Sequence, residues 1–224
     1  MSTAALDPVL AERPDQKVAC VLLLDTSGSM QGERIAELNA GLHTFKEELL
    51  KDSVASSRVD LCVITFDSEV KTIRDFGPVD GFEPPTLTAQ NQTFLGSGIL
   101  EALDKIEERK ETYKANGIAY YRPWLFIITD GVPEGEDAQT TDEAKARLKR
   151  MQDRKGVIVY AVGVGGVDLK VLSDITGTPP LALKGTQFRE LFSWLSKSLE
   201  SVSKSTPGAQ IRLPDPHWAQ MQTA

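Results

Sequence analysis

The sequence CVLLLDTSGSM, residues 20–30, decides how this chain folds. It belongs to a run of apolar residues from Val18 to Leu24 that stops at the carboxylate of Asp25. The run is too short to cross a membrane, and it has the length of a strand buried on both faces, as found inside parallel sheets. The residues that follow such a strand lie at the carboxyl edge of the sheet, where open α/β sheets bind their ligands.

Oxygen donors follow this strand at every second position. Asp25, Ser27 and Ser29 offer one carboxylate and two neutral hydroxyls, which suit a hard divalent cation such as Mg²⁺. A second apolar strand, predicted at Trp124–Thr129, also ends at a carboxylate, that of Asp130. If the two strands are neighbours at the switch point of a doubly wound sheet, both carboxylates face one crevice, and without a nearby lysine they repel each other unless a cation lies between them. The alternative is that both aspartates only cap the turns and helices that follow them.

The composition is that of an ordinary globular chain. Of 224 residues, 41% are hydrophobic and 25% are charged, which is enough for one α/β domain with a sizeable core. The net charge of −7 argues against binding to nucleic acid or to acidic membranes. Residues 1–14 lack the basic and apolar segments of a signal peptide, and Cys20 and Cys62 are expected to be free thiols in buried strands. Together these features predict a cytoplasmic protein.

Strand patterns alternate with helix patterns along the chain. Strands are predicted at 17–24, 58–66, 70–73, 124–129, 157–164 and 181–183, and helices at 32–51, 96–113, 140–154, 168–175 and 188–202. Only Asp67-Ser68-Glu69 separates the second strand from the third, so we expect an antiparallel hairpin there. The pattern predicts a doubly wound, mostly parallel six-stranded sheet of order 3-2-1-4-5-6, with one antiparallel edge strand and helices on both faces.

The same pattern divides the chain into three parts. Residues 1–16 are predicted to be a leader, residues 17–203 one α/β domain, and residues 204–224 a C-terminal tail. The tail carries Ile211, Leu213 and Trp218, through which it could dock on the domain.

Three short motifs in the chain resemble the metal-ion-dependent adhesion site of von Willebrand factor A domains. They are Asp25-x-Ser27-x-Ser29, a Thr93 that directly precedes a helix, and Thr129-Asp130-Gly131. The resemblance runs from residue 17 to residue 202 and implies the Rossmann-like fold of that family. The similarity looks closest to the bacterial intracellular branch associated with tellurium resistance, whose typical motifs stand here at 25–30, 64–67 and 128–131.

The resemblance implies a role for each of these side chains. Ser27 and Ser29 would bind the metal directly, and Thr93 would do so in the ligand-competent state. Asp25 and Asp130 would act largely through bound water. Because most direct ligands are then neutral, the cation keeps enough charge to accept a carboxylate from another protein.

The assignment of Thr93 has competitors in the same loop. The family often has Gly two positions before this Thr, where the present chain has Asn91, and Thr86 and Thr88 are alternative ligands. Thr93 is favoured because it alone directly precedes a helix.

The resemblance implies a non-enzymatic, metal-dependent module that binds another protein. The cation would be Mg²⁺, with Mn²⁺ and Ca²⁺ as alternatives, and it would accept an Asp or Glu from the partner. Asp67, Glu134 and Glu136 would form the rim that contacts this partner. The bacterial branch occurs in stress and tellurium-resistance gene clusters beside kinase-like and phosphatase-like proteins, so the resemblance implies partners of those kinds.

Two other functions are compatible with the sequence. The first is a Mg²⁺-dependent phosphohydrolase with Asp25 as its nucleophile, although that chemistry wants a second Asp where this chain has Ser27. A serine nucleophile would need a base, but His43 lies in a predicted helix and His217 in the tail. The second alternative is a scaffold whose metal site is vestigial.

Overall fold

The computed structural model of the chain describes residues 15–206 and 208–220, so most of the predicted leader lies outside the described residues. Within these residues the centre of the molecule is a seven-stranded sheet of order β3-β2-β1-β4-β5-β6-β7. Its strands are β1 (Val18–Asp25), β2 (Val59–Phe66), β3 (Val70–Pro78), β4 (Trp124–Thr129), β5 (Ile158–Gly163), β6 (Leu181–Leu183) and β7 (Ala219–Gln220). The predicted α/β fold class and the predicted order of the first six strands are therefore confirmed.

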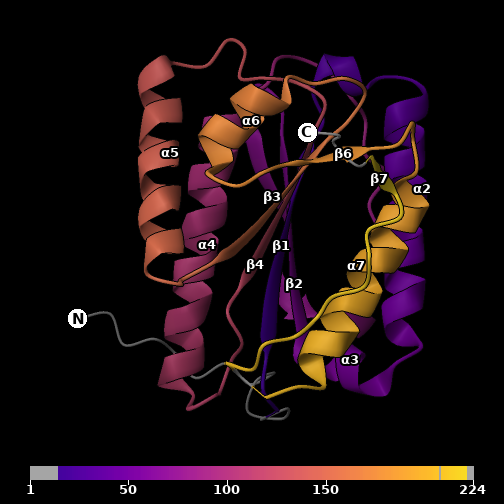
Figure 1. Ribbon diagram of the computed structural model, residues 1–224, viewed down its shortest axis with the longest axis vertical. Coiled ribbons are helices and arrows are strands. Elements are labelled where there is room, and N and C mark those ends of the chain that lie inside the picture. Colours follow the sequence, from indigo (N-terminus) through magenta and orange to yellow (C-terminus); the bar gives the residue numbers. More distant parts are fainter. Residues whose placement is uncertain (1–14, 207, 221–224) are drawn as a thin grey trace.

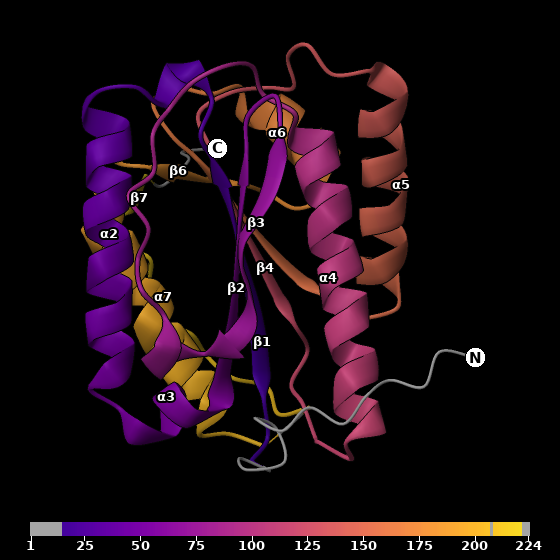
Figure 2. The same ribbon diagram turned by 180° about the vertical axis from the view of Figure 1, so that it is seen from behind.

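Helices cover both faces of this sheet, as Figures 1 and 2 show from opposite sides. One face carries α2 (Glu33–Leu50), α3 (Ser53–Arg58) and α7 (Phe188–Ser203), and the other carries α4 (Leu95–Ala115), α5 (Ala138–Asp153) and α6 (Leu169–Thr176). Two 3-10 helices, η1 (Gly28–Met30) and η2 (Val79–Gly81), follow β1 and β3. The sequence did not predict α3, because its 6 residues are too few to show a helical period.

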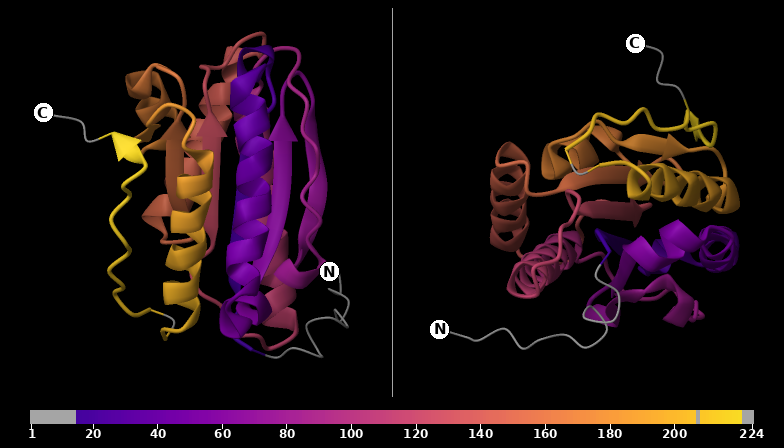
Figure 3. Two further views of the ribbon diagram at one scale, coloured as in Figure 1. Left: turned by 90° about the vertical axis from the view of Figure 1, so that its right-hand side faces the viewer. Right: turned by 90° about the horizontal axis from the view of Figure 1, so that it is seen from below.

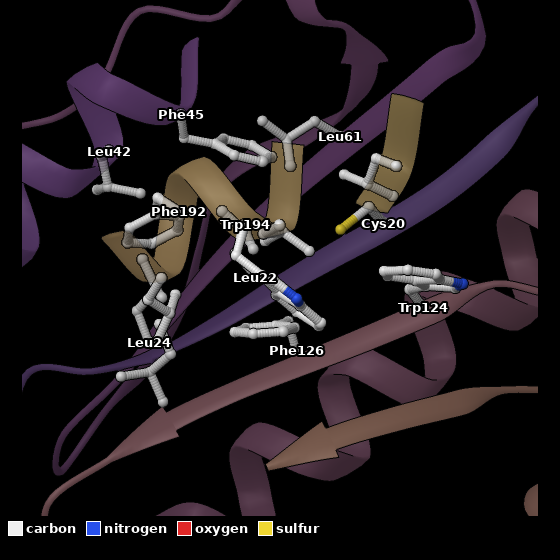
Figure 4. Packing of buried hydrophobic residues seen from close by; sticks show 14 of the residues in the cluster. Cys20, Leu22, Leu24, Leu42, Phe45, Leu61, Trp124, Phe126, Phe192 and Trp194 are labelled. Atoms are coloured by element: carbon white, nitrogen blue, oxygen red, sulfur yellow. The ribbon is translucent and has the colours of Figure 1, made fainter. Parts of the chain in front are cut away.

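Strand β1 is buried on both faces, as its unbroken apolar run predicted. It pairs in parallel with β2 on one side and with β4 on the other. Alternate side chains enter two different cores: Cys20, Leu22 and Leu24 enter one, while Val21 and Leu23 enter the other. Figure 4 shows the first set together with the aromatic side chains of α2 and α7. Because side chains alternate between the two faces of a strand, β1 packs against the helices on both sides of the sheet.

The two cysteines are free and buried, as the sequence predicted. Burial raises the pKa of the Cys20 thiol to about 12, and burial also raises the pKa of Cys62. Since the thiolate is the reactive form, both side chains behave as inert apolar packing groups.

Strands β2 and β3 form the predicted antiparallel hairpin, with Phe66 opposite Val70 and Asp60 opposite Pro78. Strand β3 is longer than the predicted 70–73, because it continues through Gly77 to Pro78. A glycine and a proline weaken the strand signal in a sequence. An edge strand nevertheless accepts both, since half of its backbone groups need no partner in the sheet.

The predicted count of six strands was wrong, because part of the C-terminal tail forms the additional strand β7. Leu183 lies opposite Ala219 and Ala182 opposite Gln220, in antiparallel pairing at the β6 edge. Next to this strand, Trp218 is 1% exposed and lies in the core. The two residues of β7 are too few to show the alternation of a strand in the sequence. Burial of this tryptophan therefore explains why the tail docks.

The parallel strands all point to the same end of the molecule, as the arrowheads in the left view of Figure 3 show. In the register of β1 and β4, Leu24 lies opposite Ile128. The loops after these strands therefore begin side by side, with Asp25 as the last residue of β1 and Asp130 as the first residue after β4.

Candidate metal-binding site

Asp25 is the innermost residue of the candidate site, and it is 0% exposed. Its Oδ1 accepts a hydrogen bond of 2.7 Å from the Ser27 backbone N–H, and its Oδ2 accepts one of 2.5 Å from the Thr129 hydroxyl of β4. Burial raises the pKa of Asp25, hydrogen bonds from Ser27 and Thr129 lower it, and the nearby charge of Asp130 raises it. The carboxylate is thus held in one orientation by both strands.

Ser27 and Ser29 connect Asp25 to Asp130, through the backbone N–H of Ser27 and the hydroxyls of both serines. Ser27 Oγ lies 3.0 Å from Ser29 Oγ, and the Ser29 hydroxyl donates to Asp130 Oδ1 at 2.6 Å. Ser27 is buried, whereas Ser29 is exposed because η1 carries it to the surface. The structure therefore brings four of the five predicted site residues into one hydrogen-bonded group.

Thr93, the fifth predicted residue, lies against the same group. A Cβ placed on Gly131 would be 3.4 Å from Thr93 Oγ1, so the threonine hydroxyl borders the residue next to Asp130. The backbone of Thr93 exchanges hydrogen bonds of 3.2 and 3.0 Å with Glu134, which fixes the two loops together. Thr93 is 4% exposed, while Thr86 and Thr88 are both exposed. This placement favours Thr93 over its two competitors.

Asn91 stands where the family often has Gly, and the backbone shows why the exchange is tolerated. Its φ is 64°, in the left-handed region that asparagine adopts more readily than other side-chain-bearing residues. Its carbonyl accepts a 2.9 Å hydrogen bond from the Gly28 N–H, so the two site loops meet at this residue.

The three predicted rim residues occupy different surroundings. Asp67 is 6% exposed, and its Oδ1 accepts a 2.9 Å bond from the Glu69 N–H in the hairpin turn. The Glu136 carboxylate accepts bonds from the Gly96 and Ser97 N–H groups at 2.8 and 2.6 Å, so it stabilises the N-terminus of α4. Of the three, only Glu134 is exposed.

Sequence reasoning missed Arg34, which lies in the first turn of α2. Its Nη1 forms an ion pair with Asp130 Oδ2 and donates a 3.1 Å hydrogen bond to the Ser29 carbonyl. The two aspartates therefore depend less on a metal between them than the sequence suggested, because an arginine supplies positive charge. A basic residue one turn after Met30, at the start of the helix that leaves the site, was the available signal.

The donor set fits a hard cation. The side chains brought together here offer two carboxylates and hydroxyls, whereas the described residues contain no group of three or more His, Cys, Asp or Glu side chains that could hold a metal. Oxygen donors of this kind, completed by water, are what Mg²⁺ prefers, and they are unlike the nitrogen and sulfur ligands of Zn²⁺ sites. Asp25, Ser27, Ser29, Thr93 and Asp130 would hold such an ion.

Several solved structures share the fold. The pilus adhesin SpaC from Lactobacillus rhamnosus GG matches with a TM-score of 0.67 and 15% identity, covering 84% of this chain and 30% of the adhesin. Proximal thread matrix protein 1 from the mussel byssus matches with a TM-score of 0.55 and 19% identity, covering 83% of this chain and 48% of that protein. Another structure of the mussel protein has zinc in its metal-ion-dependent adhesion site, or MIDAS motif. At these identities the likeness shows the fold alone.

Among curated proteins, the collagen alpha-6(VI) chain of Mus musculus is 27% identical over 179 residues, which are 79% of this chain and 7% of the collagen chain. The Homo sapiens protein is 27% identical over 178 residues, with 78% and 7% covered. This chain therefore spans only a small part of the length of these relatives. In the described part of the chain, every helix is too short or too polar to cross a membrane. The sequence model of the family described as von Willebrand factor type A domain matches residues 20–193, and the chain belongs to that family.

Proposed function

We propose that this chain is a protein-binding domain that works through one divalent cation, held by Asp25, Ser27, Ser29, Thr93 and Asp130. The observation that best supports this proposal is the hydrogen-bonded group that runs from Asp25 through both serines to Asp130. It joins the ends of two neighbouring strands at the ligand-binding edge of an α/β sheet. The cation is Mg²⁺ in this proposal, and Mn²⁺ and Ca²⁺ are the alternatives.

The partner protein offers an Asp or a Glu to this cation. Five side chains, two of which act through water, do not complete six-fold coordination, so an outward-facing water can be replaced by a carboxylate. The exposed Ser29 marks the side from which the partner approaches. Glu134, whose backbone pairs with Thr93, is exposed and disfavours a strongly acidic partner, so a lone carboxylate on a neutral or basic surface fits best.

The biological setting in this proposal follows from the resemblance to the bacterial tellurium-resistance branch. The protein is cytoplasmic, belongs to a stress-response system and binds a kinase-like or phosphatase-like partner, but neither nucleic acid nor membranes. The free, buried thiols of Cys20 and Cys62 support a reducing compartment. The collagen relatives say little about the partner, because this chain covers 7% of their length.

A phosphohydrolase that uses Asp25 as nucleophile is disfavoured by the geometry. Asp25 is 0% exposed and is held by a hydrogen bond at each carboxylate oxygen, so it is poorly placed to attack a phosphate ester that approaches from solvent. We therefore propose that the protein is not an enzyme. Turnover of a generic phosphate ester that disappears specifically in Asp25→Asn would contradict this.

Calorimetric titration with Mg²⁺ tests the metal site in the native protein, Ser29→Ala and Ser201→Ala. Ser29 is an exposed candidate ligand, so its loss removes a donor without opening the core. Ser201 donates a hydrogen bond to the Lys197 carbonyl within α7, away from the site, and serves as the matched control. We expect one Mg²⁺ per chain in the native protein and the control, and affinity at least about tenfold lower in Ser29→Ala. Equal affinity in all three proteins would contradict the site.

Dependence of partner binding on the cation separates the proposal from a metal-free scaffold. The complex with the natural partner should form in Mg²⁺, dissociate in EDTA, and fail to form with Thr93→Ala. The side chain of Thr93 borders the site while its backbone holds the Glu134 loop, so the substitution preserves the loop pairing. A complex that forms equally well in EDTA would favour the scaffold.

A further inference from the structure

The guanidinium of Arg34 lies at the candidate site, although its side chain is partly exposed. It bonds two groups of the site at once, the carboxylate of Asp130 and the carbonyl of Ser29. The Asp130 side chain is 0% exposed, and that of Arg34 is 34% exposed. A buried carboxylate without a positive partner is costly, so this ion pair stabilises the site as it stands.

The loop between β5 and α6 encloses the guanidinium from the other side. A Cβ on Gly165 would collide with Arg34 Nη2, and Gly165 has a φ of +62°, which side-chain-bearing residues rarely adopt. The chain therefore leaves space for the arginine at a position that only glycine fills easily. This close fit indicates a defined place for the guanidinium.

We infer that Arg34 is an internal cation that competes with the divalent metal for Asp130, so that the site binds metal only when metal is abundant. The inference rests on the proposed metal site. A divalent ion at Ser29 and Asp130 would share both residues with the guanidinium. Two cations that contact the same carboxylate repel each other. The outcome of this competition therefore depends on the metal concentration.

The test compares Mg²⁺ affinity in the native protein, Arg34→Gln and Arg147→Gln. Arg147 joins α5 to Asp104 and Glu107 of α4, so its substitution changes the net charge equally and serves as the control. We expect Arg34→Gln to bind Mg²⁺ at least about tenfold more tightly. A tenfold change corresponds to the Coulomb repulsion between charges of +2 and +1 about 6 Å apart in a medium with the dielectric constant of water. Arg147→Gln should bind like the native protein.

Thermal unfolding in EDTA supplies a readout that needs no metal. Without its partner, Asp130 is left as a buried charge, so Arg34→Gln should unfold at a lower temperature than the native protein. Addition of Mg²⁺ should restore more stability to Arg34→Gln than to the native protein. Arg34→Lys, which keeps the charge but loses the planar fork, should bind Mg²⁺ with intermediate affinity. This milder variant also covers the case in which Arg34→Gln does not fold.

Three other outcomes are possible, and each would overturn the inference. Equal Mg²⁺ affinity in the native protein and Arg34→Gln overturns the competition and leaves the metal site standing. Weaker binding in Arg34→Gln also overturns it, because Arg34 would then be a positioning residue that supports the cation through Asp130. Binding by none of the proteins overturns the metal site itself, and the competition with it.

Discussion

At the scale of single residues, Asn91 shows how one backbone conformation shapes the site. Its φ of 64° turns the chain so that its carbonyl reaches the Gly28 N–H, two residues before Thr93 enters the site. The left-handed region costs a residue with a Cβ roughly 1–2 kcal/mol, and asparagine reduces this cost by local hydrogen bonding.

Substitution of Asn91 should separate backbone strain from side-chain contacts. Asn91→Ala should lower the free energy of unfolding by about 1 kcal/mol, whereas Asn91→Gly should change it by less than about 0.5 kcal/mol. Urea denaturation of the three proteins measures the difference. If alanine is tolerated as well as glycine, the strain at this position is not what fixes the loop.

At the scale of secondary-structure elements, α2 and α7 pack at one glycine. A Cβ on Gly41 of α2 would lie 2.5 Å from Phe192 Cδ2 of α7, which is closer than real atoms approach. Phe192 is 0% exposed and packs at a tilt against Phe45, with ring centroids 5.6 Å apart, so the surrounding core restricts its movement. The glycine therefore sets the distance between the two helices.

Gly41→Ala should destabilise the protein although alanine is the better helix former. The gain in helix propensity is about 1 kcal/mol, and overpacking of a filled core costs typically 1–3 kcal/mol. We expect a net loss of about 1 kcal/mol in urea denaturation. Gly81→Ala is the control, because a Cβ there meets no atom within 4 Å. A more stable Gly41→Ala protein would show that the α2–α7 contact relaxes freely.

The start of α3 illustrates an electrostatic contribution at the same scale. The Asp52 carboxylate accepts a 2.8 Å bond from the Ala55 N–H and pairs with Lys204 at 2.6 Å, which ties α3 to the end of α7. The hydrogen bond from Lys204, and then that from Ala55, hold the pKa of Asp52 below its ordinary value. Because the folded pKa lies below the unfolded one, the stabilisation is present above about pH 4 and is lost as the pH falls through the folded pKa.

Asp52→Asn tests this pH dependence, since asparagine keeps the helix cap but not the charge. At pH 7 the variant should be less stable than the native protein, by no more than about 1 kcal/mol because the pair is near the surface. The difference should shrink as the pH falls below the ordinary aspartate range and through the lower folded pKa of Asp52. Urea denaturation at a series of pH values measures it, and a difference that persists in acid would contradict the electrostatic origin.

At the scale of the whole molecule, the C-terminal segment is part of the folded unit although the family match ends at residue 193. Trp218 is 1% exposed and packs edge-on against Trp194 of α7, with ring centroids 5.6 Å apart. Trp194 Nε1 donates a 2.7 Å bond to the Pro214 carbonyl. The segment also covers the edge of β6, which would otherwise present unpaired backbone groups.

Trp218→Ala should lower the free energy of unfolding by about 3 kcal/mol or more, as for other buried aromatic side chains. Trp218→Phe should cost less than about 1.5 kcal/mol, because the buried Nε1 of Trp218 has no hydrogen-bond partner among the described residues. Urea denaturation measures both. Native stability in Trp218→Ala would mean that the tail is dispensable.

The sequence by itself determined the sheet and most of the proposed site. An apolar run with a carboxylate at its end, as in 18–25 and 124–130, specifies a buried strand and its carboxyl edge, because burial on both faces is visible residue by residue. Helical patterns between these strands then indicated that strands and helices alternate. Such alternation is typical of a doubly wound sheet with the strand order 3-2-1-4-5-6. Asp25, Ser27, Ser29 and Asp130 follow from those strand ends.

Only the tertiary structure decided where the remaining side chains lie. Strand β7 is too short for a pattern, and it exists because Trp218 is buried in the core. Glu136 bonds the start of α4, although the sequence predicts it in the rim that contacts a partner. The long side chain of Arg34 pairs with the buried carboxylate of Asp130, and Gly165 leaves room for its guanidinium. Such contacts join residues far apart in the chain, so their energies depend on distances in space that no local pattern records.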